Sequence, residues 1–186
     1  MPKEGSALYF MAIIPPSPIY EQALEFKNHF KEQYQSKAAL NSPPHVTLHM
    51  PFEWKEKKED ELLSNLKSFS RNKKSIALQL QNFACFAPRV IYIHVNENEA
   101  LRTFQQELHR FCKMELNIFN AQYRDLPFHP HLTLAFRDLK KAMFEKAWSE
   151  FKNKEFFASF VADRFALLKH NGKVWEVFTE FVFTTD

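Results

Sequence analysis

The chain of 186 residues contains only two glycines, Gly5 and Gly172, and they lie far apart. P-loops, the dinucleotide fingerprint of Rossmann folds and the nucleophile elbow of serine hydrolases each need several closely spaced glycines, because their backbones approach a phosphate closely or make strained turns. The sequence therefore excludes all three kinds of site. Any chemistry on a phosphate would have to rest on side chains.

The rest of the composition is that of an ordinary globular protein, with 45% hydrophobic and 25% charged residues. The formal net charge of +3 permits a nucleic-acid partner without requiring one. Two cysteines, Cys85 and Cys112, are too few for a disulfide framework or a cysteine-based zinc site. The N-terminus lacks the apolar segment of a signal peptide, and no apolar run reaches the roughly 18 residues of a membrane span. We therefore expect a cytoplasmic protein that does not bind membranes.

Hydrophobic periodicity separates segments that repeat every two residues from segments that repeat at helical spacing. The strands expected from it are residues 8–14, 45–52, 76–81, 90–95, 131–136, 156–161, 165–169 and 174–183, and the helices are residues 18–37, 62–69, 101–111 and 143–151. Asn96 and Glu99 resemble a capping box at the start of the third helix. Asn171 and Gly172 predict a tight turn between the last two strands.

The two halves of the chain follow a similar order, in which a helix, a strand that begins with Pro-His, another helix and further strands succeed one another. Such a repeat suggests two similar lobes related by pseudo-twofold symmetry. We expect an α+β fold in which each lobe has an antiparallel-rich sheet with outer helices, and the active cleft lies between the sheets. Residues 1–186 would form one bilobal domain, with lobes of approximately 1–95 and 96–186 and possible exchange of strands between them.

Two short motifs occupy equivalent places in this repeat, 86 residues apart. They are Pro44-His45-Val46-Thr47-Leu48 and Pro130-His131-Leu132-Thr133-Leu134. A single His-x-Thr would mean little, because a strand histidine is commonly a hydrogen-bonded structural residue and threonine favours strands. Duplication at equivalent positions favours a catalytic interpretation.

The spacing of the motifs fits chemistry on a phosphodiester. Alternate side chains of a strand share a face, so the histidine and threonine of each motif point together while Val46 or Leu132 points into the core. One neutral imidazole can accept a proton from water or a hydroxyl while a protonated one donates to the leaving oxygen. The hydroxyls can bind the nonbridging oxygens. We therefore predict His45, Thr47, His131 and Thr133 as the catalytic residues.

The chain resembles the 2H phosphoesterase superfamily, which is named for two His-x-Thr/Ser motifs and includes LigT-like 2′-5′ RNA ligases and cyclic phosphodiesterases. Beyond the motifs, the segments 43–48, 86–88, 90–93 and 163–165 look like the bacterial YjcG-like branch. The resemblance implies a metal-independent site without a cofactor. It also implies that the first histidine serves as acid and the second as base, although near-symmetry lets these roles exchange.

Other residues near the motifs are weaker candidates for substrate binding. His49 follows Thr47 by two residues and would share its strand face, and His129 would lie on the rim of the cleft. Arg89 and Tyr92 are candidates for contact with a phosphate or a base, although core packing explains a strand tyrosine equally well. The clustered histidines lack a companion carboxylate, so we predict no metal. His29, His109 and His170 are expected at the solvated surface.

The sequence thus predicts a phosphoesterase that acts on a 2′,3′-cyclic phosphate or a 2′-5′ phosphodiester by acid–base catalysis with two histidines. Its substrate would be an RNA end or a small cyclic nucleotide, and the protein would act as a monomer without an obligatory protein partner. The alternative is a noncatalytic RNA- or nucleotide-binding module with the same cleft. Both motifs are intact, which argues against that alternative.

Overall fold

A computed structural model describes residues 2–119 and 127–184 of the chain. The elements, in chain order, are β1 (Ser6–Ile13), α1 (Ile19–Tyr34), η1 (Ala38–Asn41), β2 (Val46–Lys55), η2 (Glu56–Lys58), α2 (Glu59–Ser70), β3 (Ile76–Phe86), β4 (Val90–Val95), α3 (Glu99–Glu115), β5 (His131–Ala135), α4 (Lys141–Phe151), β6 (Phe157–Ala162), β7 (Arg164–His170) and β8 (Trp175–Val182). The α+β class is confirmed, and each predicted helix and strand has a counterpart.

All the paired strands are antiparallel and belong to one eight-stranded sheet with the order β6-β3-β4-β5-β2-β1-β7-β8. Strand β5, from the second half of the chain, lies between β4 and β2 from the first half. On the other side of β2 follow β1, β7 and, at the edge of the sheet, β8. The two spatial halves of the sheet therefore each contain strands from both halves of the sequence.

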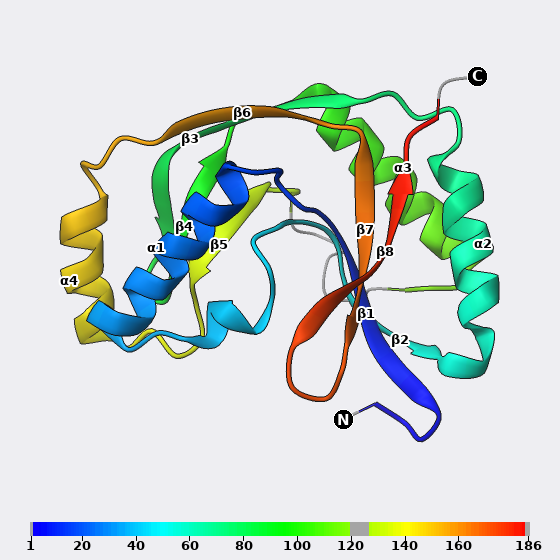
Figure 1. Ribbon diagram of the computed structural model, residues 1–186, viewed down its shortest axis with the longest axis horizontal. Coiled ribbons are helices and arrows are strands. Elements are labelled where there is room, and N and C mark those ends of the chain that lie inside the picture. The colour runs from blue at the N-terminus through cyan, green and yellow to red at the C-terminus, as the bar shows by residue number, and fades with distance from the viewer. Residues whose placement is uncertain (1, 120–126, 185–186) are drawn as a thin grey trace.

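The sheet is strongly curled. Only Asp163 separates β6, at one edge, from β7, which is seventh in the strand order. One linking residue spans only a few ångströms, so the two parts of the sheet must approach each other at this end. Figure 1 shows β6 running across the top of the molecule to meet β7. The curl creates a concave face between the two halves of the sheet.

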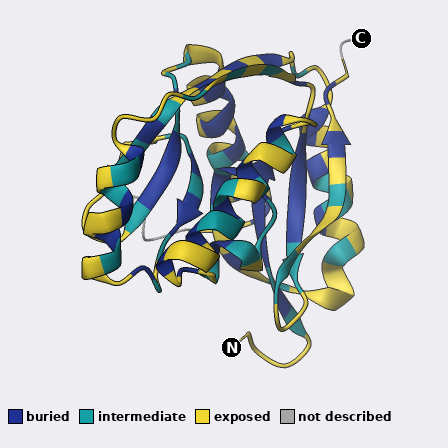
Figure 2. Ribbon diagram, turned by 60° about the vertical axis from the view of Figure 1, so that its left-hand side comes forward, coloured by how far each residue is buried: buried dark blue, intermediate teal, exposed yellow. Residues whose placement is uncertain are grey.

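Two pairs of helices cover the sheet. Helix α1 contacts α4 and β5, whereas α3 contacts α2 and β2, and α2 contacts β8 (Figure 1). The helix faces that meet the sheet are buried and the outer faces are exposed, as Figure 2 shows. Each pair thus shields the apolar side of one half of the sheet, with an amphipathic pattern typical of outer helices.

Aromatic side chains make up much of the core, as the 21 phenylalanines predict. Under α1 and α4, Phe26, Phe83 and Phe151 pack edge to face, with ring centroids 4.9–6.0 Å apart. A second group lies between α2, α3 and the other half of the sheet and includes Phe69 and Phe104. Edge-to-face contacts of this kind stabilise a core beyond the area that they bury.

The predicted capping box at Asn96 is wrong by two residues. Helix α3 begins after Asn98, whose side-chain oxygen accepts a hydrogen bond from the Leu101 amide at 3.0 Å. The Asn96 amide instead donates to the Gln79 carbonyl in β3. The turn at Asn171 and Gly172 is confirmed, with Gly172 at φ +93°. Among the described residues, no helix combines the length and apolar character needed to cross a bilayer.

Candidate active site

The two His-x-Thr motifs lie side by side at the centre of the sheet. Strands β2 and β5 pair antiparallel, with Val46 opposite Leu132, and both of these side chains are fully buried under the helices. Extending this register by one residue in each direction places His45 beside Thr133 and Thr47 beside His131. Directly opposite residues have Cβ atoms about 5 Å apart. The four predicted side chains therefore form one compact set on the concave face.

The imidazoles of the two motifs are tethered in the same way. Nδ1 of His45 lies 2.7 Å from the Pro43 carbonyl oxygen, and Nδ1 of His131 lies 2.7 Å from the His129 carbonyl oxygen. A carbonyl oxygen only accepts, so Nδ1 must carry a proton in both rings. In the neutral state, Nε2 of each ring is then the free acceptor. Both histidines are therefore held in the tautomer that can take a proton at Nε2.

An open cleft of about 880 Å³ contains the four side chains. Other lining residues that bear on its chemistry are Phe10, Lys27, Phe86, His109, His129, Arg137, His170 and Trp175. Its described wall therefore includes two cationic side chains and five histidines, but no aspartate or glutamate. A cleft with this balance favours an anion. Among the described residues, no group of three histidine, cysteine or acidic side chains is arranged to bind a metal.

Burial favours the neutral form of both imidazoles. Burial lowers the pKa of His45 to about 3; the charge of Lys27 adds to this effect, and the bond to Pro43 opposes it. Burial also lowers the pKa of His131, and the neighbouring His129 adds to the shift. A negatively charged ligand between the rings would raise both pKa values, because it stabilises the imidazolium forms.

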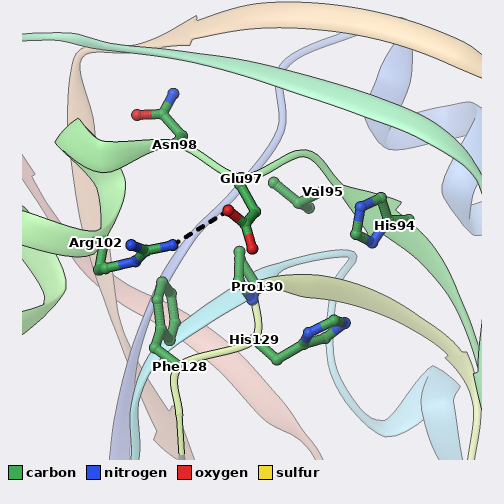
Figure 3. Close-up of a pocket in the computed structure, with 8 residues that line it drawn as sticks. All are labelled: His94, Val95, Glu97, Asn98, Arg102, Phe128, His129 and Pro130. Atoms are coloured by element: carbon green, nitrogen blue, oxygen red, sulfur yellow. Dashed lines mark ion pairs between the residues drawn. The ribbon is translucent and has the colours of Figure 1, made fainter.

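Of the weaker candidates, His129 lies in the wall of the cleft, whereas Tyr92 packs behind the second motif and is absent from the described wall. Tyr92 is buried beneath His131, with ring centroids 5.0 Å apart, and its hydroxyl lies 3.1 Å from Nε2 of His129. His129 lines the cleft and provides the carbonyl that tethers His131. These residues support the second motif. The same segment, with His94 and the Arg102–Glu97 ion pair, borders a separate cavity of about 60 Å³, shown in Figure 3.

The structure does not bring the other two weaker candidates into the cleft wall. His49 is 2% exposed, and its Nδ1 lies 2.9 Å from the Met50 carbonyl. The pairing of β2 with β1 shifts by one residue between Thr47 and His49, so the alternation of faces that predicted His49 is broken there. Arg89 is exposed at the β3–β4 turn and is absent from the described lining of the cleft.

Sequence reasoning missed several side chains of the cleft. His109 was expected at the surface, but it is half-buried, lines the cleft and packs on His49 with ring centroids 4.6 Å apart. Phe86 and Trp175 gave no sequence signal that separates them from core aromatics. Lys27 did give one, since it falls on the apolar face of the helical pattern, four residues after Ala23.

A family model described as the 2′-5′ RNA ligase superfamily matches residues 15–174. The chain belongs to this superfamily. A Geobacillus kaustophilus (strain HTA426) protein named "putative phosphoesterase" is 30% identical over 178 residues, which are 94% of this chain and 95% of the relative. A relative of the same name from Geobacillus thermodenitrificans (strain NG80-2) is 32% identical over 162 residues, covering 85% of this chain and 88% of the relative.

Solved structures share the superfamily fold. The crystal structure of Escherichia coli LigT complexed with 3′-AMP has a TM-score of 0.70 at 22% identity and covers 97% of this chain and 99% of LigT. The Thermus thermophilus protein TT0787 has a TM-score of 0.67 at 20% identity, with 95% of this chain and 97% of that protein covered. The predicted membership in the 2H phosphoesterases, and the LigT-like fold, are thereby confirmed.

Proposed function

We propose that this protein is a metal-independent phosphoesterase that acts on a 2′,3′-cyclic phosphate or a 2′-5′ phosphodiester of RNA or a nucleotide. The observation that carries the proposal is the convergence of the two tethered imidazoles and two threonines in a cleft whose described wall has cations and no carboxylate. Membership in the 2′-5′ RNA ligase superfamily and relatives named as phosphoesterases support the same reaction class.

In this proposal the phosphate lies between β2 and β5. One imidazole accepts a proton at Nε2 from the attacking water, whose oxygen forms a bond to phosphorus. The leaving oxygen departs with the electrons of its bond to phosphorus and takes the proton from Nε2 of the other imidazole. The Thr47 and Thr133 hydroxyls donate to the nonbridging oxygens, where negative charge accumulates in the transition state. Nothing in these steps needs a metal ion.

The proposal is tested by assaying the purified protein with EDTA against 2′,3′-cyclic mononucleotides and 2′-5′- and 3′-5′-linked ApA, with products separated by anion exchange. We expect turnover of a cyclic phosphate or the 2′-5′ linkage, and its loss in His45→Ala and His131→Ala. His29→Gln, which changes a histidine of α1 outside the described cleft wall, is the matched control.

The other outcomes overturn the proposal in distinguishable ways. E. coli LigT has been crystallised with 3′-AMP, so this nucleotide is a suitable binding probe. Binding of 3′-AMP without turnover of any substrate would indicate the noncatalytic nucleotide-binding module. Turnover that is lost on chelation and restored by a divalent ion would indicate a metal-dependent mechanism.

A further inference from the structure

The face of the sheet that carries the two motifs continues beyond the cleft. On β3 the exposed side chains of Ala77, Gln79 and Gln81 alternate with buried residues that pack under the helices. After the bulge at Asn82 the alternation resumes and brings Phe86, which lines the cleft, onto the same face. Strands β4, β3 and β6 therefore present one outward face that runs from the cleft to the edge of the sheet.

The pairing of the strands places four side chains in a row across this face. His131 on β5 is opposite His94 on β4. His94 faces the bulged part of β3 that contains Gln81, and Gln81 is opposite Phe157 on β6. Neighbouring strands lie about 4.8 Å apart, so the row covers about 14 Å between β5 and the sheet edge. It begins at the second motif and ends at a phenyl ring.

The far end of the row is apolar and exposed. Phe157 is 64% exposed and Val161, on the same side of β6, is 61% exposed. Strand β6 lies at the edge of the sheet, beside β3 (Figure 1). Edge strands are usually protected by charged side chains, because exposed apolar residues beside unpaired backbone groups favour aggregation. A ligand that covers these two side chains would remove that liability.

The middle of the row carries neutral hydrogen-bonding groups. Gln79 and Gln81 are exposed, and the side-chain amide of Asn96 donates to Oε1 of Gln79 at 3.4 Å. The cavity of about 60 Å³ opens beside His94 and is also lined by Arg102 (Figure 3). Amides and imidazoles offer both donors and acceptors, which are the groups that bind the edges of unpaired bases.

The charges of this region suit a polyanion. Strands β3, β4 and β6 contain no acidic residue. Two carboxylates that border them are paired with arginines, since Glu97 lies 3.5 Å from Arg102 and Asp163 lies 2.8 Å from Arg164. The adjoining cleft has two cationic side chains and no carboxylate in its described wall. A chain of phosphates can therefore pass from the cleft onto this face without strong repulsion.

We propose that His94, Gln79, Gln81, Phe157 and Val161 form an outer sheet face that binds single-stranded RNA leading to the phosphate in the cleft. The preferred substrate is then an RNA oligonucleotide end, and a mononucleotide occupies only the cleft. The inference rests on the proposed phosphoesterase function and names its substrate class. Phe157 stacks on a base and the glutamine amides bind base edges, as on other exposed sheets that hold unpaired bases on aromatic side chains.

Distance and direction favour RNA over the other occupants of such a face. A mononucleotide whose phosphate lies between β2 and β5 cannot reach Phe157, because more than three strand spacings of about 4.8 Å separate them. A second copy of the chain that paired with the β6 edge would run along β6. The row instead crosses the strands and starts at His131, so it is continuous with the cleft.

Two variants test the outer sheet face. Phe157→Ala removes the ring and Gln81→Ala removes the amide, and both side chains are exposed, so neither change should unfold the protein. Phe178→Ala changes an exposed phenylalanine of β8, at the opposite edge of the sheet, and is the matched control. Calorimetry measures the binding of oligoadenylates of one to about six nucleotides that end in a 3′-phosphate. The same lengths with a 2′,3′-cyclic phosphate end are used for kcat/KM.

We expect the affinity of the wild type to rise by about tenfold or more from 3′-AMP to the longer oligoadenylates and then to level off, because each added base gains a contact until the face is filled. Phe157→Ala should lose about tenfold in affinity for the longest oligonucleotide, the scale of one stacked base, and Gln81→Ala a few-fold. The loss for 3′-AMP should be much smaller, and Phe178→Ala should match the wild type at every length.

Equal wild-type affinity for every length would overturn the inference, as would an equal loss for 3′-AMP and the longest oligonucleotide in Phe157→Ala and Gln81→Ala. A wild-type dimer in sedimentation equilibrium that Phe157→Ala dissociates, without any length dependence, would overturn it in favour of a second copy of the chain. Length-dependent binding that needs Phe157, without turnover, would support the outer sheet face while the proposed phosphoesterase function fails. Turnover that does not respond to length would leave that function standing and overturn this inference alone. A variant that melts far below the wild type is replaced in the comparison by the other one.

Discussion

The two His-x-Thr motifs are almost identical in sequence and in the tether of their imidazoles, yet their surroundings differ. Beside His45 lies the buried ring of Phe10, whose centroid is 4.9 Å from the imidazole, and the buried Lys27 donates to the Ser42 carbonyl in the loop before it. Beside His131 lie Tyr92 and the exposed ring of Phe86, whose centroid is 5.3 Å away. In the proposed mechanism the two imidazoles transfer protons at one phosphate, and the different surroundings can give each a separate task.

The largest expected effect is the loss of either imidazole. On an ordinary alkyl ester, His45→Ala and His131→Ala should each lower turnover by about 10²–10⁴-fold, the scale of general acid–base catalysis. In a 4-nitrophenyl ester of a nucleoside phosphate, the leaving group is 4-nitrophenolate, which departs without needing a proton. On that substrate the variant that lacks the acid should recover most of its activity, whereas the variant that lacks the base should not, because the base is still required.

This leaving-group comparison is read from initial rates of nitrophenolate release and from product chromatography for the alkyl ester. Selective recovery of His45→Ala would identify His45 as the acid, the order that the family resemblance implies, whereas selective recovery of His131→Ala would identify the opposite order. Equal recovery of both variants would mean that neither imidazole has a fixed task.

The pH profile tests the same difference in the intact protein. The imidazole that acts as base must be neutral, so activity falls as the pH drops through its pKa; burial lowers the pKa of His45 to about 3. The imidazole that acts as acid must be protonated, so activity falls as the pH rises through its pKa; burial also lowers the pKa of His131 from its ordinary value. We therefore expect an acidic optimum for kcat/KM, with a higher optimum for kcat because bound phosphate raises both pKa values. A flat profile from about pH 5 to 9, with chemistry rate-limiting, would contradict proton transfer by either ring.

The threonines should show how far the symmetry extends. Thr47→Val and Thr133→Val keep the shape of the side chain and remove one hydroxyl each. We expect kcat to fall by roughly 10–10²-fold in each variant, somewhat less than for loss of a fixed oxyanion donor, because the other threonine and the imidazolium remain. Steady-state kinetics on one cyclic nucleotide measures this, and a large effect in only one variant would place the phosphate off the pseudo-twofold axis.

Local patterns predicted the helices and the strands, because hydrophobic periodicity is a local property. They also predicted that the histidine and threonine of each motif share a face, and all four side chains line one cleft. Their catalytic role stays a prediction. The exchange of strands that places β5 between β4 and β2 depends on pairing across the whole chain. His49 was misplaced because a shift in pairing with β1 breaks the alternation of faces. Lys27 was visible as a polar residue on an apolar helix face, but only the structure shows that this face borders the cleft.

The smallest expected effect concerns the two aromatic neighbours. Phe86 is 43% exposed and Phe10 is 4% exposed, although each lies against the imidazole of one motif. An exposed aromatic ring in a cleft can stack on a nucleobase, which is worth about 1–3 kcal/mol per base. Phe86→Leu should therefore raise KM for cyclic nucleotides a few-fold and leave the melting temperature unchanged. Phe10→Leu should instead lower the melting temperature by a few degrees, because it disturbs a packed cluster with Ala12, Ala166 and Leu168. A cyclic phosphate without a base is the control substrate, because its KM should not respond to Phe86→Leu. An equal rise in KM for both substrates would mean that Phe86 supports His131 and does not contact the base.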